Sequence, residues 1–125
     1  MRLNEIHTPF YDAINQLRPQ IAQAAQVVYD SWDEEELGGG GICDQIANEI
    51  GSVISDAGFG VVDGGHDGDD HAWIIAYNHK ESFVVDIPHH IYETGGGYSW
   101  QKIPGIQFTP DHVVVEPIDR PDYID

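Results

Sequence analysis

Residues 71–88 read HAWIIAYNHKESFVVDIP, and this stretch decides the fold. Two apolar runs, at 71–77 and 82–87, are rich in β-branched and aromatic residues and flank a short polar segment, which is typical of a β-hairpin. Pro88 ends the second run, because proline lacks the N–H that a strand ladder uses. The stretch therefore predicts two antiparallel strands joined by a turn around Asn78 and His79.

The length of that turn decides which side chains meet across the hairpin. A two-residue turn would put His71 directly opposite Asp86, whereas a four-residue turn would put Trp73 opposite Asp86 and leave His71 diagonal to it. Side chains alternate along a strand, so His71 and Asp86 share one face in either register. In that position a carboxylate can orient an imidazole and favour the tautomer that a general base needs.

The segment before the hairpin predicts a helix with a cysteine at its start. Gly38–Gly41 form a glycine run that cannot belong to a helix interior, and we expect a loop there. A helix is expected from Cys43, with Gly58 as its C-terminal stop. Its apolar stripe consists of Ile46, Ala47, Ile50, Val53, Ile54 and Ala57.

Cys43 is the predicted nucleophile. The dipole and the unpaired N–H groups of a helix N-terminus favour a thiolate, and the same N–H groups can stabilise an oxyanion. The structural alternative is that this single cysteine is a small core residue. Combined with the hairpin, the position of Cys43 predicts a triad of Cys43, His71 and Asp86.

Three motifs in this order resemble the transglutaminase-like branch of the papain-like superfamily. They are Gly-Gly-Ile-Cys before a helix, His-Ala-Trp-Ile-Ile opening a strand, and Phe-Val-Val-Asp-Ile-Pro ending the next. The resemblance covers residues 38–88. It implies acyl transfer at a carbonyl carbon, by a peptidase, amidase or transglutaminase-like enzyme without a cofactor. In that mechanism Cys43 attacks, His71 shuttles the proton and Asp86 orients His71.

Several residues are candidates for contact with a peptide or amide substrate. They are Gly41 and Trp73 beside the triad, and Tyr98 and Trp100 after a second glycine run. The aromatic pair could instead fold back onto the sheet. The sequence does not assign a second oxyanion donor. Gln20, Gln23 and Gln26 on the preceding helix are equivalent choices.

Metal binding is a weaker reading of the loop that precedes His71. Asp67, Asp69 and Asp70 could gather a calcium ion, but the loop lacks the spacing and the terminal glutamate of an EF-hand. A solvated acidic loop is the simpler interpretation. Histidines at 66, 71, 89 and 90 offer nitrogen ligands for zinc or nickel, although adjacent histidines on an extended chain point to opposite faces.

The remaining segments complete an α+β plan with a single domain over residues 1–125. A short helix is expected within the first 17 residues, and an amphipathic helix at 19–33 begins at Pro19. Strands are expected at 59–62 and 113–115. The predicted fold is a small antiparallel sheet covered by N-terminal helices, as in a papain-like or transglutaminase-like core.

The charge balance limits the choice of partners. Twenty-two acidic residues stand against five basic ones, giving a net charge of −17. Direct binding to nucleic acid or to an anionic membrane is disfavoured, because phosphate contacts need lysine and arginine. Such a surface can simply maintain solubility, or suit a salt-rich environment. It could also dock on a basic protein as a DNA mimic or inhibitor, which is the alternative, non-enzymatic function.

Composition and the lengths of the apolar runs also indicate where in the cell the protein is expected. Hydrophobic residues make up 41% of the chain, which is typical of a folded globule. The sequence contains no apolar run of the roughly 18–20 residues that span a bilayer, and no apolar signal core after Met1. We therefore expect a cytoplasmic protein. One cysteine cannot form an intramolecular disulfide.

Overall fold

The computed structural model describes residues 8–32, 42–64, 72–95, 101–122 and 124. The chain is an α+β protein with a small antiparallel sheet. In chain order, with η for a 3-10 helix, its elements are α1 (Pro9–Gln16), α2 (Arg18–Ser31), α4 (Cys43–Asp56), β1 (Gly60–Asp63), β2 (Ile74–Tyr77), β3 (Ser82–Asp86), η2 (His89–Ile91), β4 (Glu93–Thr94), β5 (Gln101–Lys102), η3 (Pro110–His112) and β6 (Val114–Pro117).

Local sequence explains where the N-terminal helices begin. Thr8 is the N-cap of α1, and its hydroxyl oxygen accepts a hydrogen bond of 3.1 Å from the backbone N–H of Tyr11. Proline follows at the first turn of α1 and again at the first turn of α2, where its missing N–H costs nothing. The helix predicted at 19–33 is therefore confirmed as α2, shifted by one or two residues.

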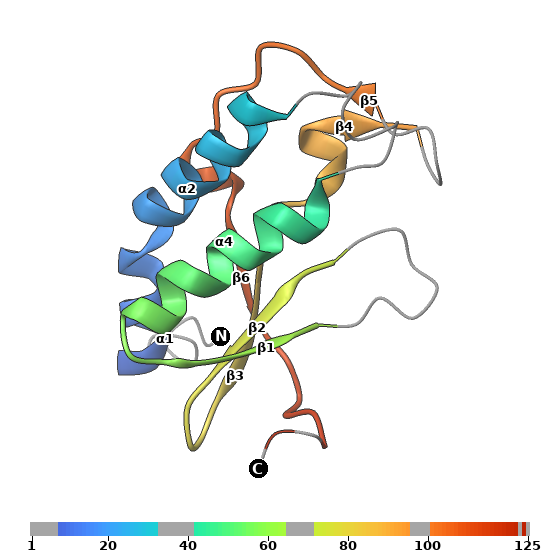
Figure 1. The fold of residues 1–125 in the computed structure, drawn as a ribbon. Helices are drawn as coiled ribbons and strands as arrows, with labels where there is room; N and C mark the ends of the chain where they lie inside the picture. Colours follow the sequence, from blue (N-terminus) through green and yellow to red (C-terminus); the bar gives the residue numbers. More distant parts are fainter. Residues whose placement is uncertain (1–7, 33–41, 65–71, 96–100, 123, 125) are drawn as a thin grey trace, which may run out of the picture.

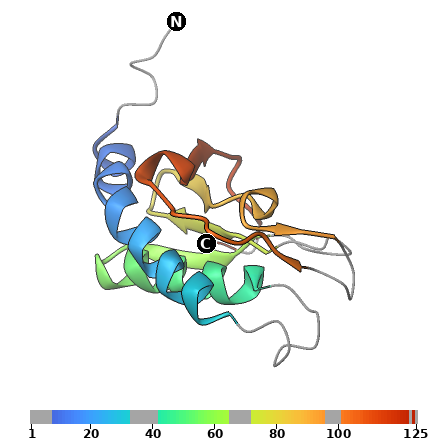
Figure 2. The same ribbon diagram turned by 90° about the horizontal axis from the view of Figure 1, so that it is seen from above.

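Helix α4 begins at Cys43, as predicted, and packs its apolar stripe onto the sheet. Ile46, Ile50 and Ile54 are almost completely buried. Gly51 allows the close approach, because a Cβ on Gly51 would lie 3.3 Å from Val61 Cγ1 and 3.4 Å from Ile74 Cδ1. Helices α2 and α4 run side by side, as Figures 1 and 2 show.

The main sheet has the strand order β1-β2-β3-β6, and its neighbouring strands are antiparallel. Ile74 pairs with Val85 and Tyr77 pairs with Ser82, so four residues form the β2–β3 turn. The Asn78 side-chain oxygen closes this turn by accepting 2.8 Å bonds from the N–H groups of Lys80 and Glu81. Of the two registers expected, the four-residue one is observed.

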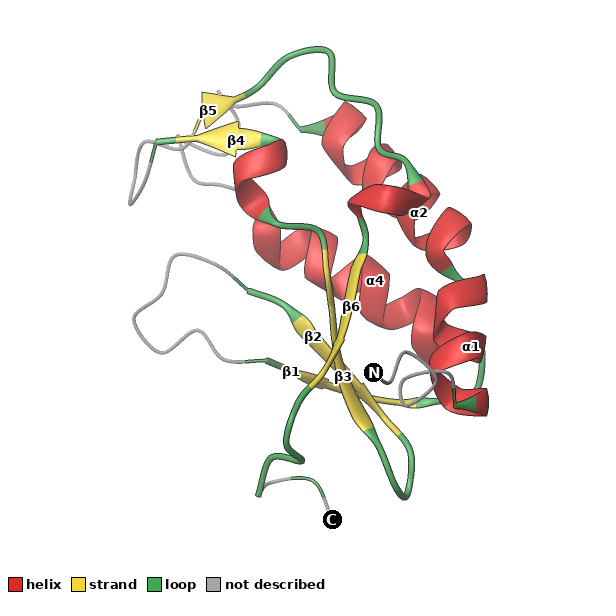
Figure 3. Cartoon of the chain, turned by 180° about the vertical axis from the view of Figure 1, so that it is seen from behind, coloured by secondary structure: helices red, strands yellow, loops and turns green. Residues whose placement is uncertain are grey.

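The two faces of the sheet carry different side chains. Phe83 and Val85 belong to the core that faces the helices, whereas Ser82, Val84 and Asp86 alternate onto the other face. Figure 1 shows α4 crossing in front of β6, and Figure 3, from behind, shows β6 crossing in front of α4. The helices therefore form one layer on one face.

The sequence reading differs from the structure at the strand ends. The strand predicted from His71 begins at Ile74, and the strand predicted at 113–115 occupies Val114–Pro117. The short β4–β5 pair and η2 were not predicted, because two- and three-residue elements leave no periodic signal. No helix in the described segments combines the length and apolarity that a membrane crossing requires.

Candidate functional site

One end of the molecule collects the beginning of α4, the end of β3 and the η2–β4 segment (Figure 1). Cys43 is the first residue of α4, and its side chain is half-buried. The preceding residue, Ile42, is fully buried and serves as the N-cap. A partly accessible thiol at the start of a 14-residue helix is therefore part of this end of the molecule.

A buried carboxylate from β4 meets the same helix start. The side chain of Glu93 is completely buried, and its Oε1 accepts a hydrogen bond from the backbone N–H of Ile42 at 3.4 Å. This bond brings a negative charge to the helix N-terminus, where the macrodipole favours it. Glu93 thereby fixes β4 to α4 next to Cys43.

Glu93 also forms an imidazole–carboxylate pair. His89 Nδ1 lies 3.7 Å from Glu93 Oε2, and the His89 side chain is 31% exposed. The spacing of four residues results from η2, which turns the chain between them. This pair lies beside the N-terminus of α4, so an imidazole other than His71 is available at the same end of the molecule.

Tyr92 is a second buried residue with a polar group at this end, beside Glu93. Its side chain is fully buried, and its hydroxyl has no hydrogen-bond partner among the described residues. Burial raises the pKa of Tyr92, and the charges of Glu93, Cys43, Asp86 and Asp44 raise it further. Tyr92 therefore keeps its proton at neutral pH. Cys43 and Asp86 thus both lie close enough to the Tyr92 hydroxyl to act on its ionisation.

Asp86 ends β3 on the face of the sheet away from α4. It pairs with Val114 of β6, and by continuation of the register Trp73, directly before β2, lies across from it. Cys43 belongs to the helix layer on the other face. The thiol and the Asp86 carboxylate can therefore share an imidazole only beyond the end of the sheet, and not across its surface.

Trp73, predicted to contact substrate, has a packing role. The Gly64 N–H donates to the Trp73 carbonyl at 2.7 Å, and the Trp73 indole occupies the space where a Cβ of Gly64 would lie. Gly64 is therefore a glycine because the indole covers it.

Other predicted site residues lie outside the described part of the chain. They are His71 of the triad, Gly41, Tyr98 and Trp100 of the substrate loops, and His66, Asp67, Asp69 and Asp70 of the metal reading. No group of three or more His, Cys, Asp or Glu side chains suited to a metal is present within the described residues.

Of the three glutamines considered as oxyanion donors, Gln26 has a side-chain amide that is already hydrogen-bonded within the fold. Gln26 Nε2 donates to the Ile106 carbonyl at 3.1 Å, and Gln26 Oε1 accepts from the Phe108 N–H at 2.7 Å. These bonds tie the segment before η3 to α2. The Gln26 amide is therefore used for structure, and both Gln20 and Gln23 are exposed on α2.

Sequence reasoning missed Tyr92, His89 as an acid-paired imidazole, and Glu93. The signal that could have found them is the single glutamate directly after Ile91 and Tyr92, since a charge next to large apolar side chains suggests a buried group with a fixed partner. That partner is a backbone N–H about fifty residues earlier in the chain, and no local pattern predicts such a contact.

No protein-family model, curated protein or solved structure matches this chain.

Proposed function

We propose that this chain is a small cysteine-nucleophile hydrolase or acyltransferase of the papain-like or transglutaminase-like kind, acting on a peptide or amide. The observation that carries the proposal is the position of Cys43 at the start of α4, together with the buried Glu93, its half-buried partner His89 and the buried Tyr92 hydroxyl. Buried ionisable groups gathered around a half-exposed thiol are costly for folding, and they are typical of sites of chemistry.

The proposed reaction begins when the Cys43 thiol gives its proton to an imidazole and its sulfur attacks the substrate carbonyl carbon. The N–H groups of the first turn of α4 would stabilise the oxyanion of the tetrahedral intermediate. The imidazolium returns the proton to the leaving amine, and a thioester remains on Cys43. Water then releases the acid, or a second amine takes the acyl group, and the thiol is regenerated.

Two imidazoles compete for the role of base. The resemblance in sequence assigns it to His71 with Asp86 as orienting acid. The pair His89–Glu93 is the rival, because its atoms are 3.7 Å apart and Glu93 also contacts the start of α4. We retain His71 as the proposed base, since the motif order supports it, and the test below separates the two.

Acyl transfer to Cys43 can be measured with p-nitrophenyl acetate. The proposal predicts a burst of p-nitrophenolate equal to the protein concentration, and an acetyl group on Cys43 in the intact-protein mass spectrum. Cys43→Ser should remove the thioester, and His71→Ala should slow its formation by roughly 100-fold or more. His89→Ala should leave the rate nearly unchanged. If His89→Ala slows acetylation and His71→Ala does not, the base is His89. If both variants are acetylated at the same rate, neither imidazole assists the thiol and the proposal is refuted.

A second candidate is a non-enzymatic acidic protein that docks on a basic partner. The net charge of −17 favours it, and Asp44, Glu49 and Asp56 are exposed along α4. An interaction of this kind should weaken steeply as salt rises. Binding to a basic protein that is insensitive to salt would contradict it.

A further inference from the structure

The outer edge of β1 has a defined arrangement of backbone groups. The Gly64 N–H donates to the Trp73 carbonyl, so this pair is a hydrogen-bonded pair of the β1–β2 ladder. Such pairs alternate with non-hydrogen-bonded ones along an antiparallel ladder. Val61 and Asp63 occupy the non-hydrogen-bonded positions, opposite Ala76 and Ile74. Their N–H and C=O groups consequently point away from β2, toward the outer edge.

The opposite edge of the sheet is closed by two features that β1 lacks. On β6 the outward-pointing positions include Pro117, which carries no N–H, and Val113 precedes the strand with its carbonyl accepting from the Arg18 guanidinium. On the β1 side, the described residues contain no further strand and no proline. The two edges of one sheet therefore differ in their capacity to accept another strand.

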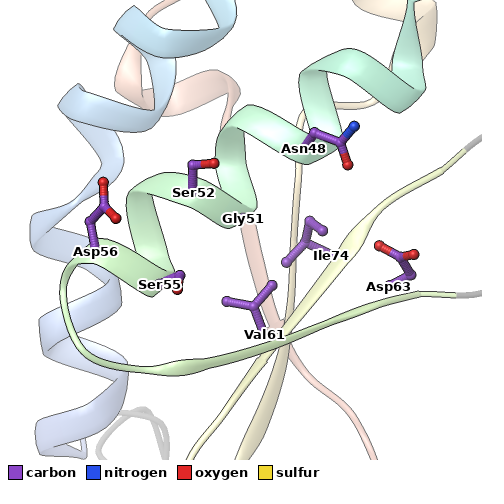
Figure 4. Close-up of a pocket in the computed structure, with 8 residues that line it drawn as sticks. All are labelled: Asn48, Gly51, Ser52, Ser55, Asp56, Val61, Asp63 and Ile74. Atoms are coloured by element: carbon purple, nitrogen blue, oxygen red, sulfur yellow. The ribbon is translucent and has the colours of Figure 1, made fainter.

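A groove runs beside the outer edge, between β1 and α4 (Figure 4). Its volume is about 300 Å³, and its walls include Val61 and Asp63 from β1 and exposed side chains from α4. The polar groups come from Asn48, Ser52, Ser55, Asp56 and Asp63. Figure 4 shows the Asp63 carboxylate extending from β1 toward α4, on the side that carries Asn48. The groove has carboxylates and hydrogen-bonding groups, and the described lining residues include no cation.

We propose that this edge and groove together bind an extended, basic segment of a partner protein, which adds to the sheet as an antiparallel strand alongside β1. Residues of the segment that pair with Val61 and Asp63 would exchange backbone hydrogen bonds with them. Their side chains would point to the same face as Val61 and Asp63, into the groove. A lysine or arginine opposite Asp63 would lie beside its carboxylate, and a second basic residue two positions away would face Ser55 and Asp56.

The negative charge of the chain favours a basic partner segment at this edge over a second copy of the same protein. Two chains of net charge −17 repel one another, and pairing β1 with β1 would bring two Asp63 carboxylates to one edge. A basic segment gains from the same field, and its encounter is accelerated by steering. The inference gives the acidic docking function a place on the molecule and is independent of Cys43 chemistry.

Backbone methylation of the probe provides the sharpest test. The probe is a short fluorescein-labelled peptide of alternating lysine and valine, titrated with the intact chain by fluorescence anisotropy. Lysines facing the groove are the residues whose N–H groups reach β1. N-methylation at the lysines should therefore weaken binding at least about tenfold, whereas N-methylation at the valines should leave it nearly unchanged. Equal binding of the two methylated peptides would overturn strand addition.

Protein variants test the groove. Asp63→Asn should weaken binding of the unmethylated peptide by about fivefold, because it removes one cross-strand charge pair. Glu49→Gln is the matched control: it removes one exposed carboxylate from α4 outside the groove, and should bind like the original chain. If both variants lose the same amount of peptide affinity, the effect comes from overall charge and the proposed site at Asp63 is wrong. Amide chemical-shift changes confined to other strands, or a concentration-dependent dimer, would also overturn it.

Cys43→Ser separates this inference from the proposed acyl transfer. The variant should bind the peptide normally, since Cys43 is not part of the groove. Loss of peptide binding in Cys43→Ser would place the peptide at the thiol and contradict a site on β1.

Discussion

Glu93 connects three features of the candidate site. Its carboxylate is completely buried, accepts from the Ile42 N–H and lies 3.7 Å from His89 Nδ1. A buried carboxylate is expensive to desolvate, and its removal leaves the groups around it without their acceptor. Glu93 is therefore both a structural link between β4 and α4 and part of the charge distribution around Cys43.

Truncation of Glu93 tests how much its contact with the start of α4 contributes to stability. Glu93→Ala is expected to lower the free energy of unfolding by about 1–3 kcal/mol, because the buried Ile42 N–H loses its acceptor. Glu93→Gln keeps a side-chain oxygen for this bond and should cost less. Urea denaturation measures both, and Glu49→Gln on the exposed side of α4 is the control. A Glu93→Ala variant as stable as the control would show that the contact contributes nothing.

Tyr92 predicts a loss of stability at alkaline pH. Burial raises the pKa of Tyr92 in the folded chain, so above about pH 10 the unfolded chain loses this proton while the folded chain retains it. Stability from this group is therefore complete below pH 10 and falls as pH rises further. Tyr92→Phe should remove this part of the alkaline dependence, and should change stability little at pH 7, since the hydroxyl has no described partner.

Urea denaturation of both proteins at pH 7 and near pH 11 gives the measurement. The original chain should lose more stability than Tyr92→Phe between the two values. Parallel losses would mean that Tyr92 ionises as freely in the folded chain as in the unfolded one.

At the scale of elements, the sequence patterns predicted the long segments better than the short ones. Helix α4 has a stripe of apolar residues at helical spacing, and its start at Cys43 was predicted correctly. The β2–β3 hairpin was also predicted, but two turn lengths fitted the pattern. The choice depends on Asn78, whose side chain closes the four-residue turn, and on Glu81, which accepts a 2.7 Å hydrogen bond from Thr8. The second contact is long-range, so local sequence does not contain it.

The candidate site was predictable only in part for the same reason. Cys43 and Asp86 were chosen as candidates because each lies at the end of a periodic segment, and these positions at the start of α4 and the end of β3 are observed. Glu93 and Tyr92 follow a three-residue 3-10 helix. Their surroundings come from distant parts of the chain, because Glu93 accepts from the Ile42 N–H and the Tyr92 ring packs against Phe108. Their environment is created by tertiary contacts, which no single-sequence pattern specifies.

The close packing of α4 on the sheet predicts that Gly51 tolerates a larger side chain less well than its neighbour Ser52 does. Gly51→Val should lower the free energy of unfolding by about 1–3 kcal/mol, because the added carbons would overlap with Val61 and Ile74. Ser52→Val is the matched control, since Ser52 is exposed and the introduced residue has the same helix propensity. Thermal denaturation compares the two. Equal stability would contradict the close contact between α4 and the sheet.

At the scale of the whole molecule, the net charge of −17 is the feature with the largest expected effect on stability. Most of the 22 acidic residues have no basic residue to pair with, since the chain has only five. The folded chain holds these charges closer together than the unfolded chain does, so repulsion destabilises it. Glu93 differs from the other acidic residues of the described segments, because its side chain is completely buried.

Added salt should consequently stabilise the fold. Raising NaCl from about 0.02 M to about 0.5 M shortens the Debye length well below the size of the molecule and should raise the Tm by roughly 2–5 °C. KCl at the same ionic strength should act alike, because screening does not depend on the identity of the ion. A Tm that is unchanged or lower in both salts would show that repulsion is not a main factor in stability.

The central claim is that the fold makes Cys43 an effective nucleophile, and its reaction rate with iodoacetamide at neutral pH tests this most directly. The account predicts that Cys43 of the folded chain is alkylated several times faster than the same cysteine in the urea-unfolded chain, and that His71→Ala removes the difference. If the folded chain reacts more slowly than the unfolded one, Cys43 is a packed thiol and the proposed enzyme is wrong.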